Sequence, residues 1–424
     1  MSKLAILGLG YVGLSIASAF REGGREIVGF DTNRRRVAEI RAGLDATGQL
    51  DPAKVKNLAA VVTDDPGQLE GCREWVIIVQ TGLTTDSAPD VSAVLSAAAT
   101  VAKMIEPGDL VVLSSTVPIG FTEENFRLTL ETLSGLAAGA DFDLAYAPER
   151  FDPGNSVQTL PTITKIISGF NDRALARVRN LYRPVVQTMV EAASIRAAEA
   201  SRLLENVQRD VNIAFLNDAA RILKAWDIDT GDVLAVTKTK WNWLPFQPGL
   251  VGGHCIAVHP HYMRQAAIEA GVSPGLTAMV RDINEALPNR IVDTCMDVLS
   301  RRGVARPPIV TVVGIAYKEN VADVRGSAAV QIVDELRARG CQVQIVDPLV
   351  RDTDLQDSHG LSLTPPAALE AGDAVILAIA HRAVVDAGWA GIMCYLPDQA
   401  GLVIDLRRAL SRDTIPPGVE LWRL

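Results

Sequence analysis

A glycine-rich turn near the start of the chain limits what its first segment can fold into. The turn reads Gly8-Leu9-Gly10-Tyr11-Val12-Gly13, follows an apolar run at residues 3–7 and precedes a helical spacing over residues 14–21. The first glycine permits a tight turn, the second lets a pyrophosphate reach the backbone, and the third lets the helix pack on the strand. The positive end of the helix would face the phosphates. Strand, turn and helix together predict a dinucleotide-binding unit.

An acidic residue at the end of the next predicted strand indicates which dinucleotide is bound. Asp31 directly follows the apolar run at residues 27–30. A carboxylate at this place accepts hydrogen bonds from ribose hydroxyls and repels the additional phosphate of NADP. We therefore expect NAD. Three arginines follow at residues 34–36, and a solvated helix start is the simplest interpretation of them.

Strands and helices alternate in two separate stretches of the chain, which is typical of parallel, doubly wound sheets. The first stretch continues through apolar runs at residues 75–79 and 110–113. The second begins after the linker Arg306-Pro307-Pro308. Its predicted elements are strands at 309–313, 341–346, 374–379 and 402–404, and a helix at 328–339.

The segment between the two stretches has a helical composition. Residues 192–226 contain no glycine or proline, so one long helix is expected there. Residues 278–302 are also predicted to be helical, with a kink or break at Pro288. The expected fold is α/β, with two doubly wound Rossmann-like domains joined by a central long-helix domain. The predicted boundaries are 1–190, 191–305 and 306–424.

Composition and charge exclude several classes of protein. The chain has 424 residues and a net charge of −9, which disfavours a nucleic-acid or anionic-membrane partner. No apolar run is long enough to span a membrane, and the first residues lack the features of a signal peptide. The five cysteines are scattered without metal-ligand spacing. We therefore expect a cytoplasmic protein with free thiols and no bound metal.

One cysteine lies in a glycine-rich segment that is suited to covalent chemistry. Cys255 stands in the run Gly252-Gly253-His254-Cys255-Ile256-Ala257-Val258-His259-Pro260, which we expect to be a loop. A thiol that attacks an aldehyde, in a chain that also binds a nicotinamide dinucleotide, predicts oxidation of an alcohol through the aldehyde to an acid. His254, His259 and His261 are interpreted as hydrogen-bonded imidazoles of a packed loop and not as zinc ligands.

Polar residues follow one face of the predicted long helix. Glu199, Arg202, Asn206 and Arg209 are spaced so that they share this face. Taken alone, such a face is interpreted as a solvated or salt-bridged surface. It becomes a candidate site if the segment around Cys255 folds back over it.

With these motifs, the chain resembles the UDP-glucose/GDP-mannose dehydrogenase family along nearly its whole length. The resemblance extends from the glycine turn through Ser114-Ser115-Thr116-Val117-Pro118 and Tyr146-Ala147-Pro148-Glu149-Arg150 to the helix at 199–217, the segment 240–255 and the turn at 318–325. The branch most similar to this chain oxidises UDP-N-acetylhexosamines to uronic acids for surface polysaccharides. The resemblance implies two NAD per sugar, a UDP-sugar substrate and, with the long apolar helix, a homodimer packed through the central domain.

The resemblance also implies roles for individual residues. The cofactor would be bound by Gly8, Gly10, Tyr11, Val12, Gly13, Asp31, Arg36, Thr81 and Thr116. The substrate would be bound by Glu149, Arg150, Arg202, Asn206, Arg209, Gly252, Tyr317, Lys318, Arg325 and Arg407. The catalytic set would be Cys255, Arg202, His259, Asn206, Glu149 and Thr116.

Two departures from the family pattern affect the proton-transfer residues. Arg202 stands where the family has a lysine, and His259 where it has an aspartate. Arginine stays protonated and cannot be a general base, although it can stabilise an oxyanion. Histidine can transfer protons near neutral pH. One alternative is a dehydrogenase that keeps Cys255 as the nucleophile and uses His259 and Arg202 in place of the family's aspartate and lysine. The others are a homologue with partial redox chemistry, a non-catalytic nucleotide-sugar sensor, or a 3-hydroxyacid dehydrogenase, which would not explain the Cys255 segment.

Overall fold

The computed structural model describes residues 2–48, 50–151, 159–304 and 306–424 of the chain. The chain forms two compact units, Met1–Glu205 with His261–Ser273, and Asn206–Pro260 with Pro274–Leu424. Both borders between the units fall inside helices, at residue 205 in α7 (Ile195–Ala225) and at residue 260 in α9 (His254–Glu269). The division into three domains at 190 and 305 stays a prediction.

The first unit contains an eight-stranded sheet in the order β10-β9-β8-β7-β4-β1-β2-β3. The pairs are parallel except β8 with β9, which is antiparallel, so the expectation of a wholly parallel sheet is wrong at this edge. The described residues between these two strands form no helix, and a crossover helix is the usual way to return a chain in parallel. The strands are β1 (Lys3–Leu7), β2 (Ile27–Phe30), β3 (Val62–Thr63), β4 (Cys72–Ile77), β7 (Leu110–Leu113), β8 (Asp143–Tyr146), β9 (Lys165–Gly169) and β10 (Met189–Glu191).

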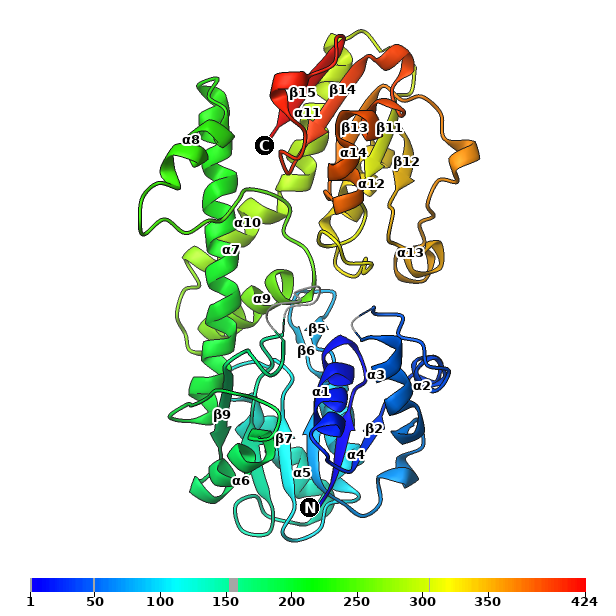
Figure 1. Cartoon of the computed structure of the whole chain (residues 1–424). Coiled ribbons are helices and arrows are strands. Elements are labelled where there is room, and N and C mark those ends of the chain that lie inside the picture. Colours follow the sequence, from blue (N-terminus) through cyan, green and yellow to red (C-terminus); the bar gives the residue numbers. More distant parts are fainter. Residues whose placement is uncertain (1, 49, 152–158, 305) are drawn as a thin grey trace. The chain divides into compact units, whose positions relative to one another are not determined.

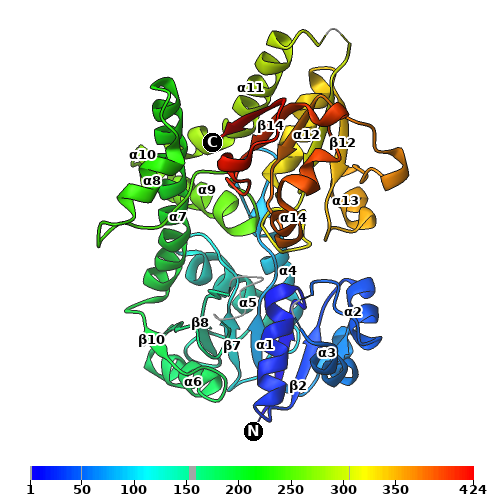
Figure 2. The ribbon, with the colours of Figure 1, turned by 45° about the horizontal axis from the view of Figure 1, so that its top comes forward.

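Helices cover both faces of this sheet (Figures 1 and 2). Successive residues of β1 show the two layers, because Leu4 and Ile6 belong to one buried cluster and Ala5 and Leu7 to the other. The first cluster includes α1, α2, α3 and α6, whereas the second includes α4 and α5. This two-sided burial confirms the doubly wound fold. The helices are α1 (Tyr11–Glu22), α2 (Arg34–Arg41), α3 (Pro52–Leu58), α4 (Ser92–Ala102), α5 (Arg127–Ser134) and α6 (Asp172–Tyr182).

Long helices make up the middle of the chain. The expected helix at 192–226 is confirmed as α7, and the expected break near Pro288 as the junction between α10 and α11. Proline is tolerated there because it lies in the first turn of α11. Among the described residues, no helix has the length and apolar character that a membrane span requires. The further helices are α8 (Thr230–Thr237), α10 (Leu276–Glu285) and α11 (Leu287–Arg301).

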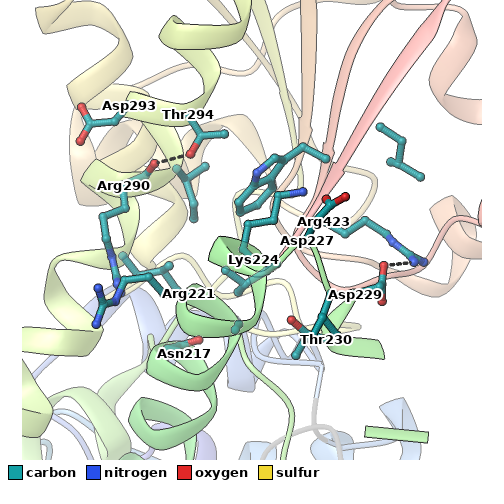
Figure 3. Close-up of a pocket in the computed structure, with 17 residues that line it drawn as sticks. Asn217, Arg221, Lys224, Asp227, Asp229, Thr230, Arg290, Asp293, Thr294 and Arg423 are labelled. Atoms are coloured by element: carbon teal, nitrogen blue, oxygen red, sulfur yellow. Dashed lines mark hydrogen bonds and ion pairs between the residues drawn. The ribbon is translucent and has the colours of Figure 1, made fainter. Parts of the chain in front are cut away.

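A pocket opens in the second unit where the last turns of α7 approach α11 and the last strand of the chain (Figure 3). Its volume is about 470 Å³. Basic side chains from α7 and α11 lie on its wall, among them Arg221, Lys224 and Arg290.

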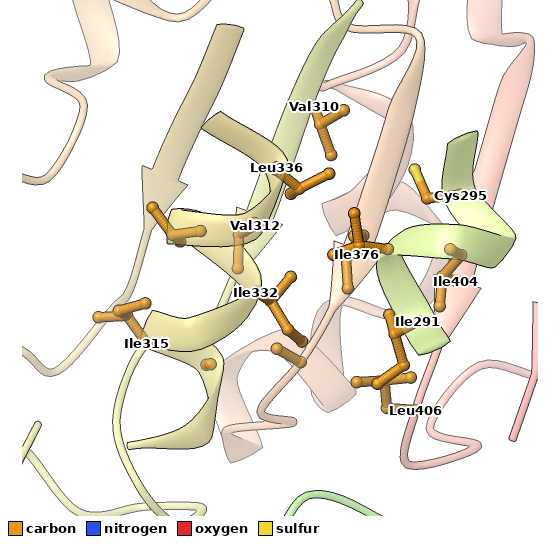
Figure 4. Packing of buried hydrophobic residues seen from close by; sticks show 14 of the residues in the cluster. Ile291, Cys295, Val310, Val312, Ile315, Ile332, Leu336, Ile376, Ile404 and Leu406 are labelled. Carbon is orange, nitrogen blue, oxygen red and sulfur yellow. The ribbon is translucent and has the colours of Figure 1, made fainter. Parts of the chain in front are cut away.

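The second unit also contains a five-stranded parallel sheet in the order β12-β11-β13-β14-β15. On one face, Ile291 and Cys295 of α11 and Ile332 of α12 pack with Val312 and other strand residues (Figure 4). A smaller cluster that includes α14 covers the other face. The strand β15 was not expected from the sequence. The elements are β11 (Ile309–Val313), α12 (Ala328–Ala338), β12 (Gln342–Val346), α13 (Asp352–His359), β13 (Ala374–Leu377), α14 (Arg382–Met393), β14 (Gly401–Asp405) and β15 (Val419–Arg423).

Candidate active site

The glycine turn has the geometry that a bound pyrophosphate requires. Gly8 has φ +97°, and a Cβ there would lie 2.3 Å from the carbonyl oxygen of Ile78. A Cβ on Gly13 would lie 1.8 Å from the carbonyl oxygen of Gly8, whereas one on Gly10 would meet no atom within 4 Å. Gly10 is also the N-cap of α1 and supplies no capping side chain. The turn therefore leaves open space beside the N–H groups of a helix start, which fits a dinucleotide phosphate.

Asp31 and Arg36 both contact the turn at Leu9. The Asp31 carboxylate accepts hydrogen bonds from the N–H of Leu9 (2.7 Å) and of Asn33 (2.8 Å), one on each oxygen. Each oxygen keeps a second lone pair, so a ribose hydroxyl can still bind. Arg36 donates through Nε to the carbonyl of Leu9 (2.9 Å) and pairs with Asp45 (2.8 Å). The expectation of a solvated arginine is wrong for Arg36, because these acceptors hold it in the interior.

Two threonines predicted to line the cofactor site are in direct contact. Thr81 donates its hydroxyl to the carbonyl oxygen of Thr116 at 2.9 Å. The side chain of Thr81 is buried, and Thr116 is half-buried. Both follow strands of the first sheet, Thr81 after β4 and Thr116 after β7, at the carboxyl edge where such sheets bind ligands.

A buried lysine holds Glu149, and sequence reasoning did not identify it. Lys165, the first residue of β9, forms an ion pair with the Glu149 carboxylate, and both side chains are buried. Burial lowers the pKa of Lys165. The Lys165 ammonium also lies 4.5 Å from the centre of the Tyr182 ring, and the Tyr182 hydroxyl lies 3.2 Å from Ser114 Oγ. The signal in the sequence was a single lysine that opens an otherwise apolar strand.

A second missed residue, Glu205, binds two of the predicted substrate residues. Its carboxylate lies 2.6 Å from Arg150 Nη2 and 3.4 Å from Arg202 Nη1. Arg202 is buried and Arg150 is about a third exposed. Glu205 is three residues beyond Arg202 on α7, so helical spacing could have identified the pair.

The polar face of α7 is buried, which corrects the expectation of a solvated surface. Glu199 and Asn206 are fully buried and Arg202 nearly so. The Glu199 carboxylate accepts hydrogen bonds from the N–H of Gly120 (2.6 Å) and from the N–H and hydroxyl of Thr122 (2.9 and 2.6 Å). Burial raises the pKa of Glu199 to about 7 despite these donors.

This raised pKa predicts a pH dependence of stability that belongs to Glu199. Between pH 4.5 and 7 the folded form holds a proton that the unfolded form releases, so stability falls as the pH rises through this window. The shift from 4.5 to about 7 corresponds to about 3 kcal/mol. In urea unfolding at pH 5 and pH 8, Glu199→Gln should reduce the difference between the two free energies by up to this amount. Glu70→Gln, at an exposed position just before β4, should leave it unchanged. Parallel pH profiles of the wild type and Glu199→Gln would exclude this assignment.

Within the second unit, Asn206, Arg209 and His259 form a hydrogen-bonded chain. Arg209 Nη2 donates to Asn206 Oδ1 at 2.6 Å, and Asn206 Nδ2 lies 2.6 Å from His259 Nδ1. His259 is 1% exposed. The segment after Cys255 therefore does fold against the part of the polar face that lies in the second unit, so Asn206 and Arg209 meet the condition for a candidate site.

Cys255 lies in the first turn of a helix and not in the expected loop. Helix α9 begins at His254 and continues through Pro260, after Gly253 with φ +79°. Cys255 is half-buried, whereas Cys72 and Cys295 are buried. Burial raises the pKa of the Cys72 thiol to about 11 and that of the Cys295 thiol to about 12. The free N–H groups of a helix start stabilise negative charge that develops beside them.

The two glycines before Cys255 pack against the turn at residues 317–326. The N–H of Gly253 donates to the carbonyl of Gly326 (2.9 Å), and a Cβ on Gly253 would lie 2.5 Å from the Tyr317 ring. A Cβ on Gly252 would lie 3.0 Å from the carbonyl oxygen of Gly326. A side chain at residue 253 would clash with the Tyr317 ring, and one at residue 252 would require the Gly326 backbone to shift, so the close contact explains why the sequence has Gly252-Gly253.

The structure gathers the other predicted nucleotide residues around the same segment. Arg325 pairs with Asp323 (2.7 Å), whose carbonyl accepts from the N–H of Tyr317 (2.9 Å), and Lys318 is half-buried in the same turn. Arg407 pairs with Glu319 (2.5 Å) and lies beside Gly249, where a Cβ would be 2.8 Å from its Nη1. The neighbouring Arg408 donates to the carbonyl of Leu424 instead.

A buried polar network supports the segment that leads to Cys255. Asn217 of α7 accepts from the N–H of Gly249 (2.8 Å) and donates to its carbonyl (3.1 Å). Asn217 also donates to Asn284 (2.8 Å), which donates to Asp210 (2.8 Å). Arg281 completes the network with two hydrogen bonds to the Asp210 carboxylate. The network ties α7, α10 and the segment before Cys255 into one arrangement.

No group of three metal-ligating side chains occurs among the residues that the structure describes. His261 is buried, and the side chain of His254 lies outside the described part of the chain.

Comparison with known proteins accounts for all three parts of the chain. Models of the UDP-glucose/GDP-mannose dehydrogenase family match residues 2–186 (NAD binding domain), 196–286 (central domain) and 311–412 (UDP binding domain). The chain is 36% identical to a Pseudomonas aeruginosa UDP-N-acetyl-D-glucosamine 6-dehydrogenase over 97% of this chain and 98% of that protein. It is 37% identical to protein CapL of Staphylococcus aureus over 100% and 99%. The structure of a UDP-D-ManNAc dehydrogenase from Pyrococcus horikoshii superposes with a TM-score of 0.88 at 30% identity, covering 99% of this chain and 98% of that one.

The fold and the matched domains define an NAD-dependent dehydrogenase of UDP-sugars. The chain belongs to the UDP-glucose/GDP-mannose dehydrogenase family. The UDP binding domain and the central domain also explain the parts of the chain that a 3-hydroxyacid dehydrogenase would leave unexplained.

Proposed function

We propose that this protein oxidises the C6 alcohol of a UDP-N-acetylhexosamine or UDP-hexose to the uronate. The observation that carries the proposal is the half-buried Cys255 thiol at the start of α9, on a segment that packs against the Tyr317–Gly326 turn of the UDP binding domain. A nucleophile beside the predicted nucleotide site matches an oxidation that continues past the aldehyde. The named activities of two relatives, on UDP-N-acetyl-D-glucosamine and on UDP-N-acetyl-D-mannosamine, support an N-acetylated substrate.

The overall reaction converts one alcohol, two NAD and one water into a carboxylate, two NADH and protons. Bound NAD would accept an electron pair in each of the two oxidations. Cys255 Sγ adds to the aldehyde carbon and gives a thiohemiacetal, which becomes a thioester when it is oxidised. Water then attacks the thioester carbon, the carbon–sulfur bond breaks, and the thiol is regenerated as the acid leaves.

We assign Arg202 to charge stabilisation and not to proton abstraction. A guanidinium keeps its protons in proteins, so Arg202 cannot take a proton from the sugar hydroxyl. It can donate hydrogen bonds to an oxygen that becomes negatively charged during the reaction. Glu205, at 3.4 Å from Arg202 Nη1, would hold the guanidinium in place.

We further assign His259 to the tautomer that carries its proton on Nε2. Arg209 can only donate, so Asn206 must present its oxygen to Arg209 and its NH₂ group to His259. His259 Nδ1 therefore accepts, and in the neutral ring the proton is on Nε2. In this state His259 supplies a proton or a hydrogen bond from Nε2. A water is then the base that first deprotonates the sugar hydroxyl.

Arg209→Met is expected to release this constraint. Without the guanidinium, the Asn206 amide can turn over and accept from Nδ1–H, so His259 can be protonated. We expect kcat to fall roughly tenfold and the pH profile of kcat to gain an ionisation that the wild type lacks. Gln208→Met, at an exposed neighbouring position of α7, should keep the wild-type profile. An unchanged profile in Arg209→Met would contradict the tautomer assignment.

Counting NADH per product tests the proposed function directly. The protein is incubated with NAD and a panel of UDP-N-acetylhexosamines and UDP-hexoses, and the product is identified by mass spectrometry. Two NADH per uronate are expected. One NADH per aldehyde would instead support partial oxidation. This is the main competing function, because Arg202 and His259 replace the lysine and aspartate of the family. Thermal stabilisation by UDP-sugar with no NADH would support a sensor.

We also propose that the protein is a homodimer formed through α7. Phe215, Ile222 and Trp226 are 60%, 49% and 77% exposed and share one face of this helix, whereas Leu216 and Ala220 are buried on another. A line of large apolar side chains on a long helix matches an interface between two copies.

Replacing Phe215 and Ile222 together by aspartate is expected to produce monomers. Two buried charges facing each other across a two-fold axis would cost several kcal/mol without compensating pairs. Light scattering after gel filtration should give half the wild-type mass for this variant. Leu128→Asp, on the exposed face of α5, should leave the mass unchanged. A wild-type mass in the double variant would exclude this interface.

A further inference from the structure

The pocket between α7, α11 and β15 uses none of the residues assigned to the cofactor or the sugar nucleotide. Its volume of about 470 Å³ is within the range of small-ligand sites. Figure 3 shows side chains of all three elements around the space, with Arg290 and Arg221 at one end and Arg423 with Asp229 at the other.

The end formed by Arg290 and Arg221 has an excess of positive charge. Arg290 Nε is shielded from solvent and has no hydrogen-bond acceptor in the described structure, and Nη2 donates only to the carbonyl of Ile283 (3.1 Å). Within the described residues no carboxylate forms an ion pair with Arg290, whereas Arg221 pairs with Asp218 (2.8 Å). Burial and the neighbouring Arg221 charge lower the pKa of Arg290, whereas the nearby Asp218 carboxylate acts in the opposite direction. A bound anion would supply the missing acceptor.

The remainder of the pocket is apolar or acidic, with Asp227, Asp229 and Asp293 on its wall. Asp293 is paired with Arg339 (2.6 Å). Leu287 and Ile291 of α11 are buried and form part of the floor, together with Trp422 of β15. At the far end Asp229 is paired with Arg423, so its carboxylate does not repel an anion strongly. Lys224 adds a third cation, and Figure 3 shows it extending between the two ends.

The pocket is also connected to the segment that carries the nucleophile. Asn217 lines the pocket and makes both hydrogen bonds to the backbone of Gly249, which precedes Cys255 by a few residues.

The pocket faces away from the apolar face of α7 that we propose for the dimer. Ala220 and Lys224 line the pocket, and each is two residues from Ile222, which places it about 200° around the helix from the dimer face.

We propose that this pocket is an effector site for a small organic phosphate, whose phosphate binds Arg290, Arg221 and Lys224 and whose apolar part rests on Leu287, Ile291 and Trp422. Binding would change the hydrogen-bonding environment of Asn217 and thereby the position of the Cys255 segment. Only this regulatory part rests on the proposed function, whereas binding itself does not.

Phenyl phosphate is a suitable probe, used with the full-length protein and with saturating UDP to fill the nucleotide site. Isothermal titration should give a single saturable site with a Kd of about 0.1–1 mM, and binding of inorganic phosphate should be several-fold weaker because it lacks an apolar part. Arg290→Gln should weaken phenyl phosphate binding at least tenfold, since it removes a charge-assisted contact. Arg301→Gln, on the same helix but exposed and paired with Glu420, should bind like the wild type.

The two parts of the proposal have separate outcomes. The site would be overturned if the wild type shows no saturable binding of phenyl phosphate. It would also be overturned if Arg290→Gln melts at the wild-type temperature and binds phenyl phosphate as tightly as the wild type. If phenyl phosphate binds and changes kcat in the wild type but not in Arg290→Gln, the effector role is supported. If it binds without changing the kcat of an active enzyme, the effector role is wrong. A lack of NADH with every UDP-sugar would count against the proposed function alone.

Discussion

Cys255→Ser is expected to yield no uronate under conditions in which the wild type converts its substrate completely. A serine hydroxyl remains protonated and is a much weaker nucleophile than a thiol at neutral pH, so the covalent step should slow by about 10³-fold or more. NADH formation per sugar should fall from two to at most one. Product analysis by mass spectrometry together with absorbance at the NADH band measures both quantities.

A matched substitution separates this effect from general damage. Cys394 is exposed and lies outside every proposed site, so Cys394→Ser should retain wild-type activity. Uronate formation by Cys255→Ser at the wild-type rate would rule out the thioester route. It would leave the family membership and the fold unaffected, because those rest on the whole chain.

Arg281→Leu is expected to destabilise the second unit by about 3–5 kcal/mol, because it leaves the Asp210 carboxylate buried without its partner. Asp210 is completely buried, and burial raises its pKa. Chemical denaturation at neutral pH should show the loss. The effect should become smaller in acid, where protonation of Asp210 removes the uncompensated charge.

Two further variants test this interpretation. Arg351→Leu removes an exposed ion pair with Asp354 and should cost less than about 1 kcal/mol. The double variant Asp210→Leu/Arg281→Leu should recover part of the loss, since it removes both charges. The stability of Asp210→Leu alone completes the comparison. If the double variant loses more free energy of unfolding than Asp210→Leu and Arg281→Leu lose together, the hydrogen bonds of Asn284 and Asn217, and not the ion pair, carry the stability.

The fold was predictable where the pattern is local. The strand, glycine turn and helix at residues 3–22 follow from neighbouring residues, as does the long uninterrupted helix α7. The antiparallel edge of the first sheet was not predictable in this way, because the direction of β9 depends on its connection and not on its own residues. Strand β15 was also missed, because its five residues include Glu420 and Arg423 and its pairing with β14 is what defines it as a strand.

The candidate site shows the same limit. The sequence singled out Cys255 and its two glycines as candidates, but Pro260 obscured the helix that begins at His254 and carries the cysteine. The contacts of Lys165 with Glu149 and of Asn217 with Gly249 join residues far apart in the chain, and no spacing rule predicts them. The cofactor role of Arg36 stays a prediction, and its buried contact with the Leu9 carbonyl depends on packing that the sequence does not reveal.

The continuity of α7 constrains how this sequence can change during evolution. Arg202 and Glu205 belong to one compact unit and Asn206 and Arg209 to the other, with only helical turns between them. A single inserted or deleted residue near position 205 would rotate everything downstream by about 100° relative to everything upstream. Arg202 and Asn206 would then no longer share one face of α7. Insertions should therefore be excluded from this helix in functional descendants, while the connecting loops remain free to vary in length.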